Sequence, residues 1–178
     1  MLKRKPFWIL LLVAIFTASA GIAQQSDTYR DPGASFRKAV DLFNKEVYSG
    51  AQAIFDEITA MDPAEHPSLV ADARFFDAMC DAELQHDNAS EKIEAFINDY
   101  PEHPQSKLAH FYLGRINFDE GRYRDAMYAF REVRPSQLDR EWLPEYYYKT
   151  GYCYLKMNQP GKAKTYLKKA ASSNSRYS

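Results

Sequence analysis

A short apolar pattern recurs four times along the chain, and this repeat limits the possible folds more than any other feature. In each copy an alanine is followed four residues later by a large apolar residue, and three residues after that by another apolar one. The copies are Ala51/Phe55/Ile58, Ala89/Ile93/Phe96, Ala126/Phe130/Val133 and Ala163/Leu167/Ala170. Their alanines lie 38, 37 and 37 residues apart, a period typical of stacked-repeat proteins. Such units stack to bury their apolar stripes and leave long surfaces open, so the pattern favours binding over catalysis.

The residues between the copies follow helical periodicity. Phe36, Val40 and Phe43 lie at helical spacing ahead of the first copy, and no stretch alternates apolar and polar residues as a β-strand does. The sequence therefore predicts an all-α fold, an α-solenoid of about four helical hairpins within one domain over residues 34–173. The expected hairpins span about residues 34–63, 67–101, 105–135 and 143–173.

Glycine, proline and asparagine mark the expected helix ends. The predicted turns inside the first, third and fourth hairpins are Ser49-Gly50, Gly121 and Pro160-Gly161. Asn88 is expected to cap the second helix of the second hairpin. Pro144 should lie in the first turn of the helix that opens the fourth hairpin.

The first residues have the three parts of a secretory signal peptide. Three basic residues precede an apolar run at residues 7–16, and small residues follow as far as Ala23. Cleavage after Ala20 or Ala23 fits this pattern. We favour Ala23, which makes residues 1–23 the signal peptide and residues 24–33 a flexible lead-in. An uncleaved membrane anchor is the alternative, although ten apolar residues are fewer than the roughly 20 that span a bilayer.

Composition and charge narrow the class of partner. The chain is 46% hydrophobic and 15% aromatic, which argues against disorder. Its formal net charge is −1, and loss of the three basic residues of the signal peptide makes it −1 − 3 = −4, so nucleic acid is not an expected partner. Residues 50–104 hold thirteen acidic side chains against two basic ones, whereas residues 146–178 hold seven basic side chains and no acidic one. We interpret most of these as solvated helix faces, with a basic end suited to an acidic partner.

No motif for catalysis, a cofactor or a metal is present. The sequence lacks a glycine-rich phosphate loop and a G-x-S-x-G motif, and its four histidines lack metal-ligand spacing. Cys80 and Cys153 fall in hairpins two stacking steps apart, too far for a disulfide, so we expect buried free thiols. The sequence predicts a non-enzymatic protein with neither cofactor nor metal.

The third hairpin, LGRINFDEGRYRDAMYAF at residues 113–130, resembles the tetratricopeptide repeat (TPR). The matching residues are Leu113-Gly114 in the first helix, Gly121 and Tyr123 at the turn, and Ala126 and Phe130 in the second helix. Small residues at 114 and 126 let the two helices cross closely. This resemblance implies a right-handed solenoid.

The other hairpins follow the same pattern to different degrees. Gly151 and Ala163 keep the spacing of twelve residues found between Gly114 and Ala126, and so do Ala39 and Ala51. The second hairpin departs, because Ala78 lies only eleven residues before Ala89 and His86 replaces the turn tyrosine. We expect this hairpin to be irregular.

Two longer segments resemble exported TPR proteins of Gram-negative envelopes, including those of Bacteroidetes. They are YPEHPQSKLAHFYLG and LPEYYYKTGYCYLKMNQPGKAKTYLKKA. The resemblance implies a scaffold that binds a protein or peptide in the cell envelope, periplasmic or associated with the outer membrane and soluble after signal cleavage. Membrane association would come only through partners or an uncleaved signal segment. In longer proteins of this type a tail like residues 174–178 leads into further repeats, so we expect either more repeats or a partner that covers the last hairpin.

In TPR proteins the first helices of successive hairpins line a concave surface, which predicts a binding face here. Phe111, Arg115 and Phe118 of the third hairpin correspond to Tyr148, Tyr152 and Leu155 of the fourth, each set at i, i+4, i+7 spacing. Arg115 beside tyrosines is expected to contact a peptide or a carboxylate. Phe111 and Phe118 fit a place in the core between hairpins equally well.

Two other functions remain open from the sequence. A carbohydrate-binding helical-repeat protein would use Tyr146, Tyr147 and Tyr148 as stacking surfaces, although neighbouring tyrosines of one helix cannot all face one side. The chain could also be the N-terminal docking domain of a longer protein.

Overall fold

The computed structural model describes residues 31–174, and every regular element among them is helical. Residues 1–30, which hold the predicted signal peptide and most of the lead-in, and residues 175–178 lie outside the described residues. The elements are α2 (Pro32–Asn44), α3 (Tyr48–Thr59), α4 (Pro67–Glu83), α5 (Ala89–Asp99), α6 (Ser106–Asp119), α7 (Tyr123–Glu132), the 3-10 helix η1 (Pro135–Gln137), α8 (Leu143–Lys156) and α9 (Pro160–Asn174).

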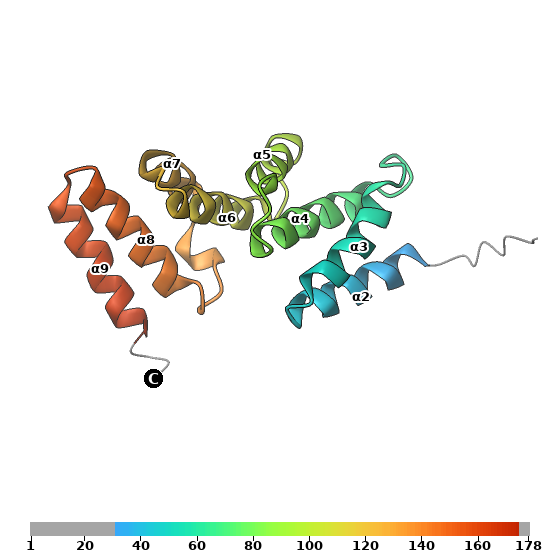
Figure 1. Cartoon of the computed structure of the whole chain (residues 1–178), viewed down its shortest axis with the longest axis horizontal. Coiled ribbons are helices and arrows are strands. Elements are labelled where there is room, and N and C mark those ends of the chain that lie inside the picture. The colour runs from blue at the N-terminus through green and yellow to red at the C-terminus, as the bar shows by residue number, and fades with distance from the viewer. Residues whose placement is uncertain (1–30, 175–178) are drawn as a thin grey trace, which may run out of the picture. The chain divides into compact units, whose positions relative to one another are not determined.

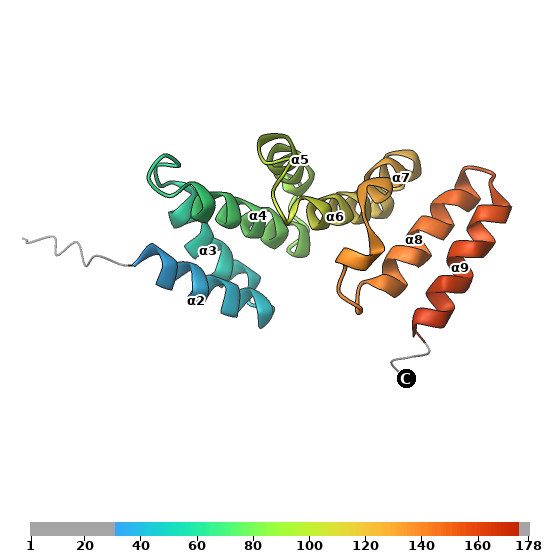
Figure 2. The same ribbon diagram turned by 180° about the vertical axis from the view of Figure 1, so that it is seen from behind.

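Consecutive helices pair into hairpins, which we number 1 to 4: α2–α3, α4–α5, α6–α7 and α8–α9 (Figure 1). Each hairpin also packs on the next, through α3 against α4, α5 against α6 and α7 against α8. The first helices α2, α4, α6 and α8 contact one another in succession and form one layer, and Figure 2 shows the same order from behind. The predicted all-α helical-repeat solenoid is confirmed.

The turn inside each hairpin is a Schellman motif, in which a residue with positive φ ends the first helix. These residues are Glu46, Gln85, Gly121 and Asn158, with φ of 61°, 58°, 76° and 56°. In hairpin 3 the amide of Arg122 donates to the carbonyl of Asn117 at 2.8 Å, and the amide of Gly121 donates to the carbonyl of Phe118 at 3.0 Å. The same two backbone hydrogen bonds occur in the other three turns. The turns are therefore set by the backbone, and three of the four do without glycine.

Three predicted helix boundaries differ from the structure. Tyr48 already begins α3, so the turn of hairpin 1 lies at Glu46 and not at Ser49-Gly50. Pro160 likewise begins α9, because proline is tolerated in the first turn of a helix. α2 begins at Pro32, inside the predicted lead-in, because the Asp31 side chain caps it by accepting a hydrogen bond from the amide of Gly33 at 3.0 Å.

The other predicted ends can be compared in the same way. Gly121 lies in the turn of hairpin 3 with positive φ, as expected, and Pro144 lies in the first turn of α8. Asn88 does precede α5, but its side chain makes no capping hydrogen bond.

The helices of hairpins 3 and 4 cross at glycine. A Cβ atom added to Gly114 would overlap the ring of Phe130, and one added to Gly151 would lie 2.9 Å from Cγ of Leu167. Hairpins 1 and 2 carry alanine at the matching positions, Ala39 and Ala78, both fully buried. The close crossing predicted from the small residues is thus observed, and it is tightest where glycine stands.

The apolar core has two parts joined at two aromatic residues, Phe43 of α2 and Phe76 of α4. The larger part extends over α4 to α9, and the smaller fills the space among α2, α3 and α4. Phe76 of α4 packs against both, with its ring stacked 5.3 Å from that of Phe55. Cys80 and Cys153 are buried free thiols, as predicted. Burial raises the pKa of Cys80 to about 12 and that of Cys153 to about 11, so both thiols stay protonated at neutral pH.

Candidate functional site

The six residues predicted to form one binding face divide into two sets that lie on different helices. Phe111, Arg115 and Phe118 lie on α6 and contact α8 of the next hairpin; we call them the covered stripe. Tyr148, Tyr152 and Leu155 lie on α8 itself, the last of the first helices that the structure describes; we call them the open stripe. The same i, i+4, i+7 spacing therefore marks a face that packs on the next hairpin in hairpin 3 and the face of the last described first helix in hairpin 4.

Phe111 is a core residue. Its side chain is 0% exposed, and its ring packs 5.8 Å from that of Trp142 and 6.4 Å from that of Tyr146. Both partners belong to hairpin 4. Of the two interpretations that the sequence left open for Phe111, the structure shows the core between hairpins.

Arg115 ties three hairpins together. Its Nη1 donates to Oε1 of Glu83 in α4 at 2.8 Å, and its Nε donates to Oε1 of Glu145 in α8 at 3.0 Å. The guanidinium also lies 5.0 Å from the ring centres of Tyr112 and Trp142. Burial on its own would lower the pKa of Arg115, but Glu145 and Glu83 raise it. Two of the five N–H groups of Arg115 are thus bonded to glutamates. A peptide carboxylate would meet a guanidinium whose charge is already balanced, and the contact predicted from the sequence stays a prediction.

Lys149 extends this set of ion pairs. Its buried amine pairs with Asp119 and lies 3.5 Å from Oε1 of Glu145. Glu83, Arg115, Glu145, Lys149 and Asp119 thus alternate in sign across α4, α6 and α8, and we call them the charge ladder. Sequence reasoning missed it because its cross-hairpin partners lie 30 to 32 residues apart. Only Glu145 and Lys149, at i, i+4, gave a local signal.

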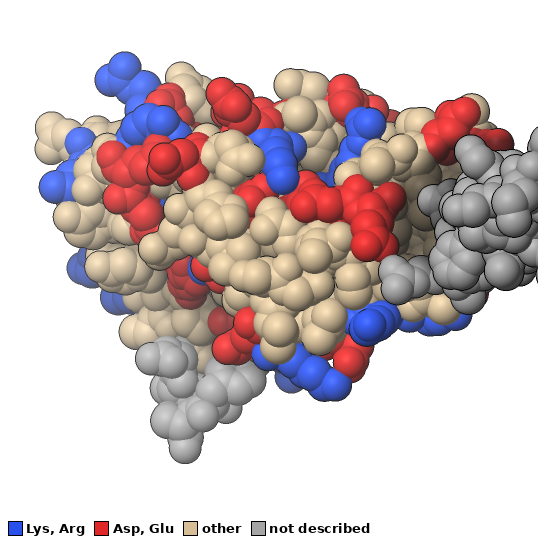
Figure 3. Space-filling view, turned by 45° about the vertical axis from the view of Figure 1, so that its right-hand side comes forward, with Lys and Arg blue, Asp and Glu red and all other residues tan. Residues whose placement is uncertain are grey.

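A cleft of about 290 Å³ opens beside the charge ladder, between the α4–α5 turn and α6. Its apolar lining comes from Ala82, Tyr112 and Ile116 among others. Its acidic lining is Glu83, Asp87, Asp119 and Glu120. We call it the acidic cleft. Figure 3 shows that acidic side chains also form a run across one face of the molecule, next to a broad uncharged area.

The open stripe is accessible. Tyr148 is 50% exposed and Leu155 is 46% exposed, while Tyr152 is half-buried. The ring of Tyr152 packs 5.4 Å from that of Phe118, and the amine of Lys156 lies 5.2 Å from the centre of the Tyr152 ring. The open stripe is therefore an aromatic and aliphatic surface with a lysine at its edge.

The three consecutive tyrosines of α8 do not form one platform. Tyr146 is buried, and its hydroxyl donates to the carbonyl of Phe130 at 3.3 Å. Tyr147 packs on Tyr166 of α9 at 6.2 Å, and only Tyr148 is exposed. Their different environments do not favour the sugar-stacking surface considered from the sequence.

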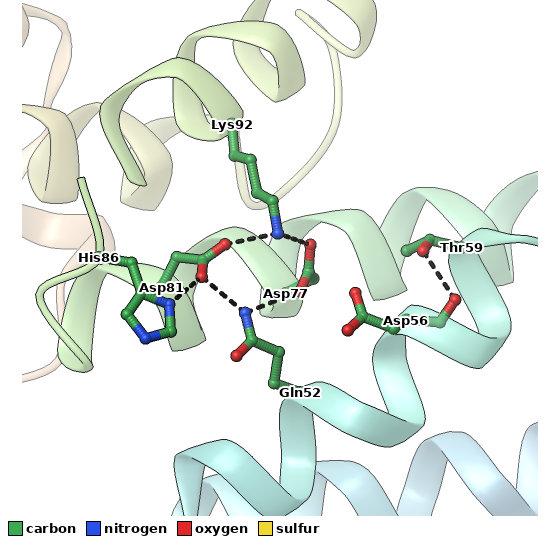
Figure 4. Close-up of polar contacts among 7 residues, drawn as sticks. All are labelled: Gln52, Asp56, Thr59, Asp77, Asp81, His86 and Lys92. Atoms are coloured by element: carbon green, nitrogen blue, oxygen red, sulfur yellow. Dashed lines mark hydrogen bonds and ion pairs between the residues drawn. The ribbon is translucent and has the colours of Figure 1, made fainter. Parts of the chain in front are cut away.

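A polar network around two buried aspartates lies inside hairpin 2 and reaches α3 of hairpin 1 (Figure 4). The amine of Lys92 lies between two carboxylates of α4, 2.7 Å from Oδ2 of Asp77 and 2.5 Å from Oδ2 of Asp81. Oδ1 of Asp81 also accepts from Nε2 of Gln52 and contacts Nδ1 of His86, both at 2.6 Å. These five residues form the buried network, which joins α3, α4 and α5.

The two aspartates of the buried network differ in acidity. Burial raises the pKa of Asp77 above its ordinary value, although Lys92 opposes the change. Burial acts in the same direction on Asp81, but hydrogen bonds from Lys92, His86 and Gln52 outweigh it and lower its pKa. The carboxylates are thus occupied by protein groups, which indicates a structural role.

Sequence reasoning treated the acidic residues as solubilising and did not find this network. The available signal was Asp77 and Asp81 at i, i+4 inside the apolar segment FFDAMCDA at residues 75–82. Within residues 31–174 no three His, Cys, Asp or Glu side chains are arranged to hold a metal. In the same range no helix is long and apolar enough to cross a bilayer.

Comparison with known proteins supports the fold. A family model described as Tetratricopeptide repeat matches residues 145–175, so hairpin 4 contains a TPR. Among solved structures the chain is similar to the MamA RS-1 ArsTM double mutant, with a TM-score of 0.60 and 16% identity over 83% of this chain and 77% of that one. A MamA crystal structure gives 0.60 and 14% over 83% and 80%. MamA 41-end from Desulfovibrio magneticus RS-1 gives 0.59 and 16% over 82% and 77%.

These identities are low, so the structural matches concern the fold alone. No curated protein sequence matched the chain significantly.

Proposed function

We propose that this protein is a non-enzymatic scaffold that binds a protein or peptide and is exported to a bacterial cell envelope. The observation that carries the binding proposal is the acidic cleft in the layer of first helices, where apolar and acidic groups lie side by side. Helical-repeat folds present such layers as extended surfaces for other polypeptides. Export rests on the signal-peptide pattern of residues 1–23.

The cleft favours a basic segment of the partner. Four acidic side chains line it. Three of them already have basic partners, since Glu83 pairs with Arg115, Asp119 with Lys149 and Glu120 with Arg122. A lysine or arginine side chain would meet Asp87, which is exposed at the rim, and would compete with Arg122 for the exposed Glu120, while an adjoining apolar residue would contact Ile116. This partner is opposite in charge to the carboxylate expected from Arg115 in the sequence.

The binding test uses a double substitution at the rim of the cleft. Asp87→Asn with Glu120→Gln removes two negative charges from exposed positions outside the charge ladder. The matched control, Glu91→Gln with Glu94→Gln, removes two from the exposed surface of α5. We expect crosslinking in the native envelope fraction, read by mass spectrometry, to recover a stoichiometric polypeptide with the wild type and the control and to lose it with the cleft variant. Equal recovery with both variants would exclude the cleft as the binding site.

The export proposal has a separate test. The N-terminal sequence of the protein recovered from the envelope fraction should begin at Gln24, or at Gly21 if cleavage follows Ala20. Recovery of the chain only from the cytoplasm, with residues 1–23 intact, would refute export and leave the binding proposal standing.

A further inference from the structure

The step from hairpin 3 to hairpin 4 shows what covers a stripe of this kind. Trp142, which precedes α8, and Tyr146 of α8 pack on Phe111. Tyr148 and Tyr152 of α8 pack on Phe118 at 6.5 Å and 5.4 Å. Each residue of the open stripe lies 37 positions after its counterpart in the covered stripe. The natural occupant of the open stripe is therefore a helix placed on α8 as α8 is placed on α6.

Exposure supports this assignment. The exposed large apolar side chains of residues 31–174 are Val47, Tyr128, Tyr148 and Leu155, and two of these four belong to the open stripe. They stand at the positions of Phe111, which is fully buried, and Phe118, which is partly buried. Tyr148 and Leu155 are thus exposed where their counterparts are covered, whereas Tyr152, between them, is half-buried against Phe118 and Tyr123.

Charge indicates the chemistry of the occupant. In the observed step Asp119 of α6 pairs with Lys149 of α8. The position that matches Asp119 in hairpin 4, 37 residues later, is Lys156, which is exposed. The sign is reversed, so the group facing Lys156 should be acidic. Four exposed lysines of α9 strengthen the same preference: Lys162, Lys164, Lys168 and Lys169.

A second copy of this chain does not fit as the occupant. Ala39 of α2 matches Gly151 of α8, an offset of 112 residues, so the α2 counterpart of Tyr146 is Ala34 and that of Lys149 is Arg37. Stacking α2 of another copy on the open stripe would replace an aromatic ring with a methyl group. It would also place Arg37 opposite Lys156, and like charges repel.

We propose that the open stripe docks an amphipathic α-helix of a partner protein, with an aromatic or aliphatic face and an acidic residue opposite Lys156. The proposal rests on the scaffold function proposed above and names a surface and a kind of partner for it. Helix docking in an apolar groove is a recurrent mode of protein recognition. This surface is distinct from the acidic cleft, which lies beside α4 and α6.

The probe is a synthetic peptide that copies residues 139–157 with Lys149→Glu. In the structure this segment packs on the covered stripe of α6. A second peptide keeps Lys149. Binding to the full-length protein is measured by fluorescence anisotropy. We expect the glutamate peptide to bind about tenfold more tightly than the lysine peptide, because one meets Lys156 with opposite charge and the other with like charge. Lys156→Glu in the protein should reverse this order.

Two variants separate docking on the open stripe from other contacts. Leu155→Asp should abolish binding of both peptides, and its fold can be checked by circular dichroism because Leu155 is already exposed. Tyr128→Ser is the matched control, since Tyr128 is 61% exposed but lies on α7, and it should leave binding unchanged.

Three results would overturn the proposal. They are no binding of either peptide at concentrations up to about 1 mM, binding that survives Leu155→Asp, and self-association of the protein that Leu155→Asp removes, which would assign the surface to a second copy. The cleft variant Asp87→Asn with Glu120→Gln should still bind the peptide. Loss of the envelope partner by the cleft variant tests the acidic cleft, and binding of the peptide tests the open stripe. The two proposals can therefore fail independently.

Discussion

Hairpins 2 and 3 have the same backbone design, but hairpin 2 adds charged groups to the apolar contacts between its helices. In both, a small residue lies seven positions before the positive-φ residue of the turn: Ala78 before Gln85, and Gly114 before Gly121. Hairpin 3 then packs the Phe130 ring directly on Gly114, whereas hairpin 2 contains the buried network. The backbone turn and the small residue therefore fix the hairpin, and hairpin 2 accommodates buried carboxylates beside the contact between Phe75 and Phe96.

One feature is shared across this difference. In hairpin 2 His86 contacts Asp81 at 2.6 Å, and in hairpin 3 Nε of Arg122 donates to Oδ1 of Asn117 at 2.8 Å. In each pair the two residues are five positions apart, and their side chains make a contact across the turn. In hairpin 2 this pair also belongs to the buried network, because Asp81 is bonded to Gln52 and Lys92 as well.

The largest expected effect is the loss of Asp81. Asp81→Ala would leave Lys92 with Asp77 alone and remove the acceptor used by Gln52 and His86. Lys92 keeps Asp77 and is partly exposed, so the main cost is the loss of hydrogen bonds to a charged acceptor, about 1.5–3 kcal/mol. We expect the free energy of unfolding in urea to fall by about that amount.

The control in hairpin 3 is Asn117→Ala, which removes one hydrogen bond to Arg122 and should cost about 1 kcal/mol. Equal effects of the two substitutions would show that the buried network contributes no more than a single turn contact.

The next largest effect tests the close contact between Gly114 and the Phe130 ring in hairpin 3. Gly114→Ala places a Cβ atom against the Phe130 ring, and we expect this overpacking to cost about 1–3 kcal/mol in the same urea experiment. The matched change in hairpin 2 is Ala78→Gly, which should cost about 1 kcal/mol through backbone entropy. A Gly114→Ala variant as stable as the wild type would mean that Phe130 moves aside freely.

The hairpins themselves were predictable from the sequence because their determinants are local. Helical periodicity and the recurrent alanines located the helices, and Gly114 with Ala126 indicated the close crossing. The positive-φ turns were harder to place, because Glu46 and Gln85 have no conformational preference that marks them. Pro160 was misleading, since proline occurs both in turns and at helix starts.

The polar features were not predictable, because they depend on residues that meet only after stacking. Arg115 was predicted to contact a ligand on the concave face, but in the structure it binds Glu83 and Glu145, which lie 32 and 30 residues away. Lys92 and Asp77 come together across two helices for the same reason. The sequence repeat identifies equivalent positions in the four hairpins, but it does not show which of these positions the next hairpin covers.

The pH dependence of stability provides a third test of hairpin 2. The folded-state pKa of Asp81 is lowered, so its contribution to stability is present above its ordinary pKa of 3.8 and is lost as the pH falls through the folded value. We expect the difference in free energy of unfolding between the wild type and Asp81→Asn to be largest at neutral pH and to shrink below pH 3.8. A difference that stays constant down to the acid transition would contradict the lowered pKa.

Asp77 should behave in the opposite way. Its folded-state pKa is raised, so its contribution is complete below its ordinary value of 3.8 and is lost as the pH rises through the folded value. Asp77→Asn should therefore be least harmful at neutral pH, relative to its effect in acid. The opposite pH trends of these two neighbouring variants form an internal control.

The smallest effects concern the turns. Gln85 of hairpin 2 has φ of 58° and Gly121 of hairpin 3 has φ of 76°, in a region that glycine adopts without strain. Gln85→Gly should therefore raise the free energy of unfolding by up to about 1 kcal/mol, and Gly121→Ala should lower it by about 1 kcal/mol. If both substitutions destabilise, the Gln85 side chain must contribute to hairpin 2 beyond its backbone conformation. The turn would then differ between the two hairpins as their interiors do.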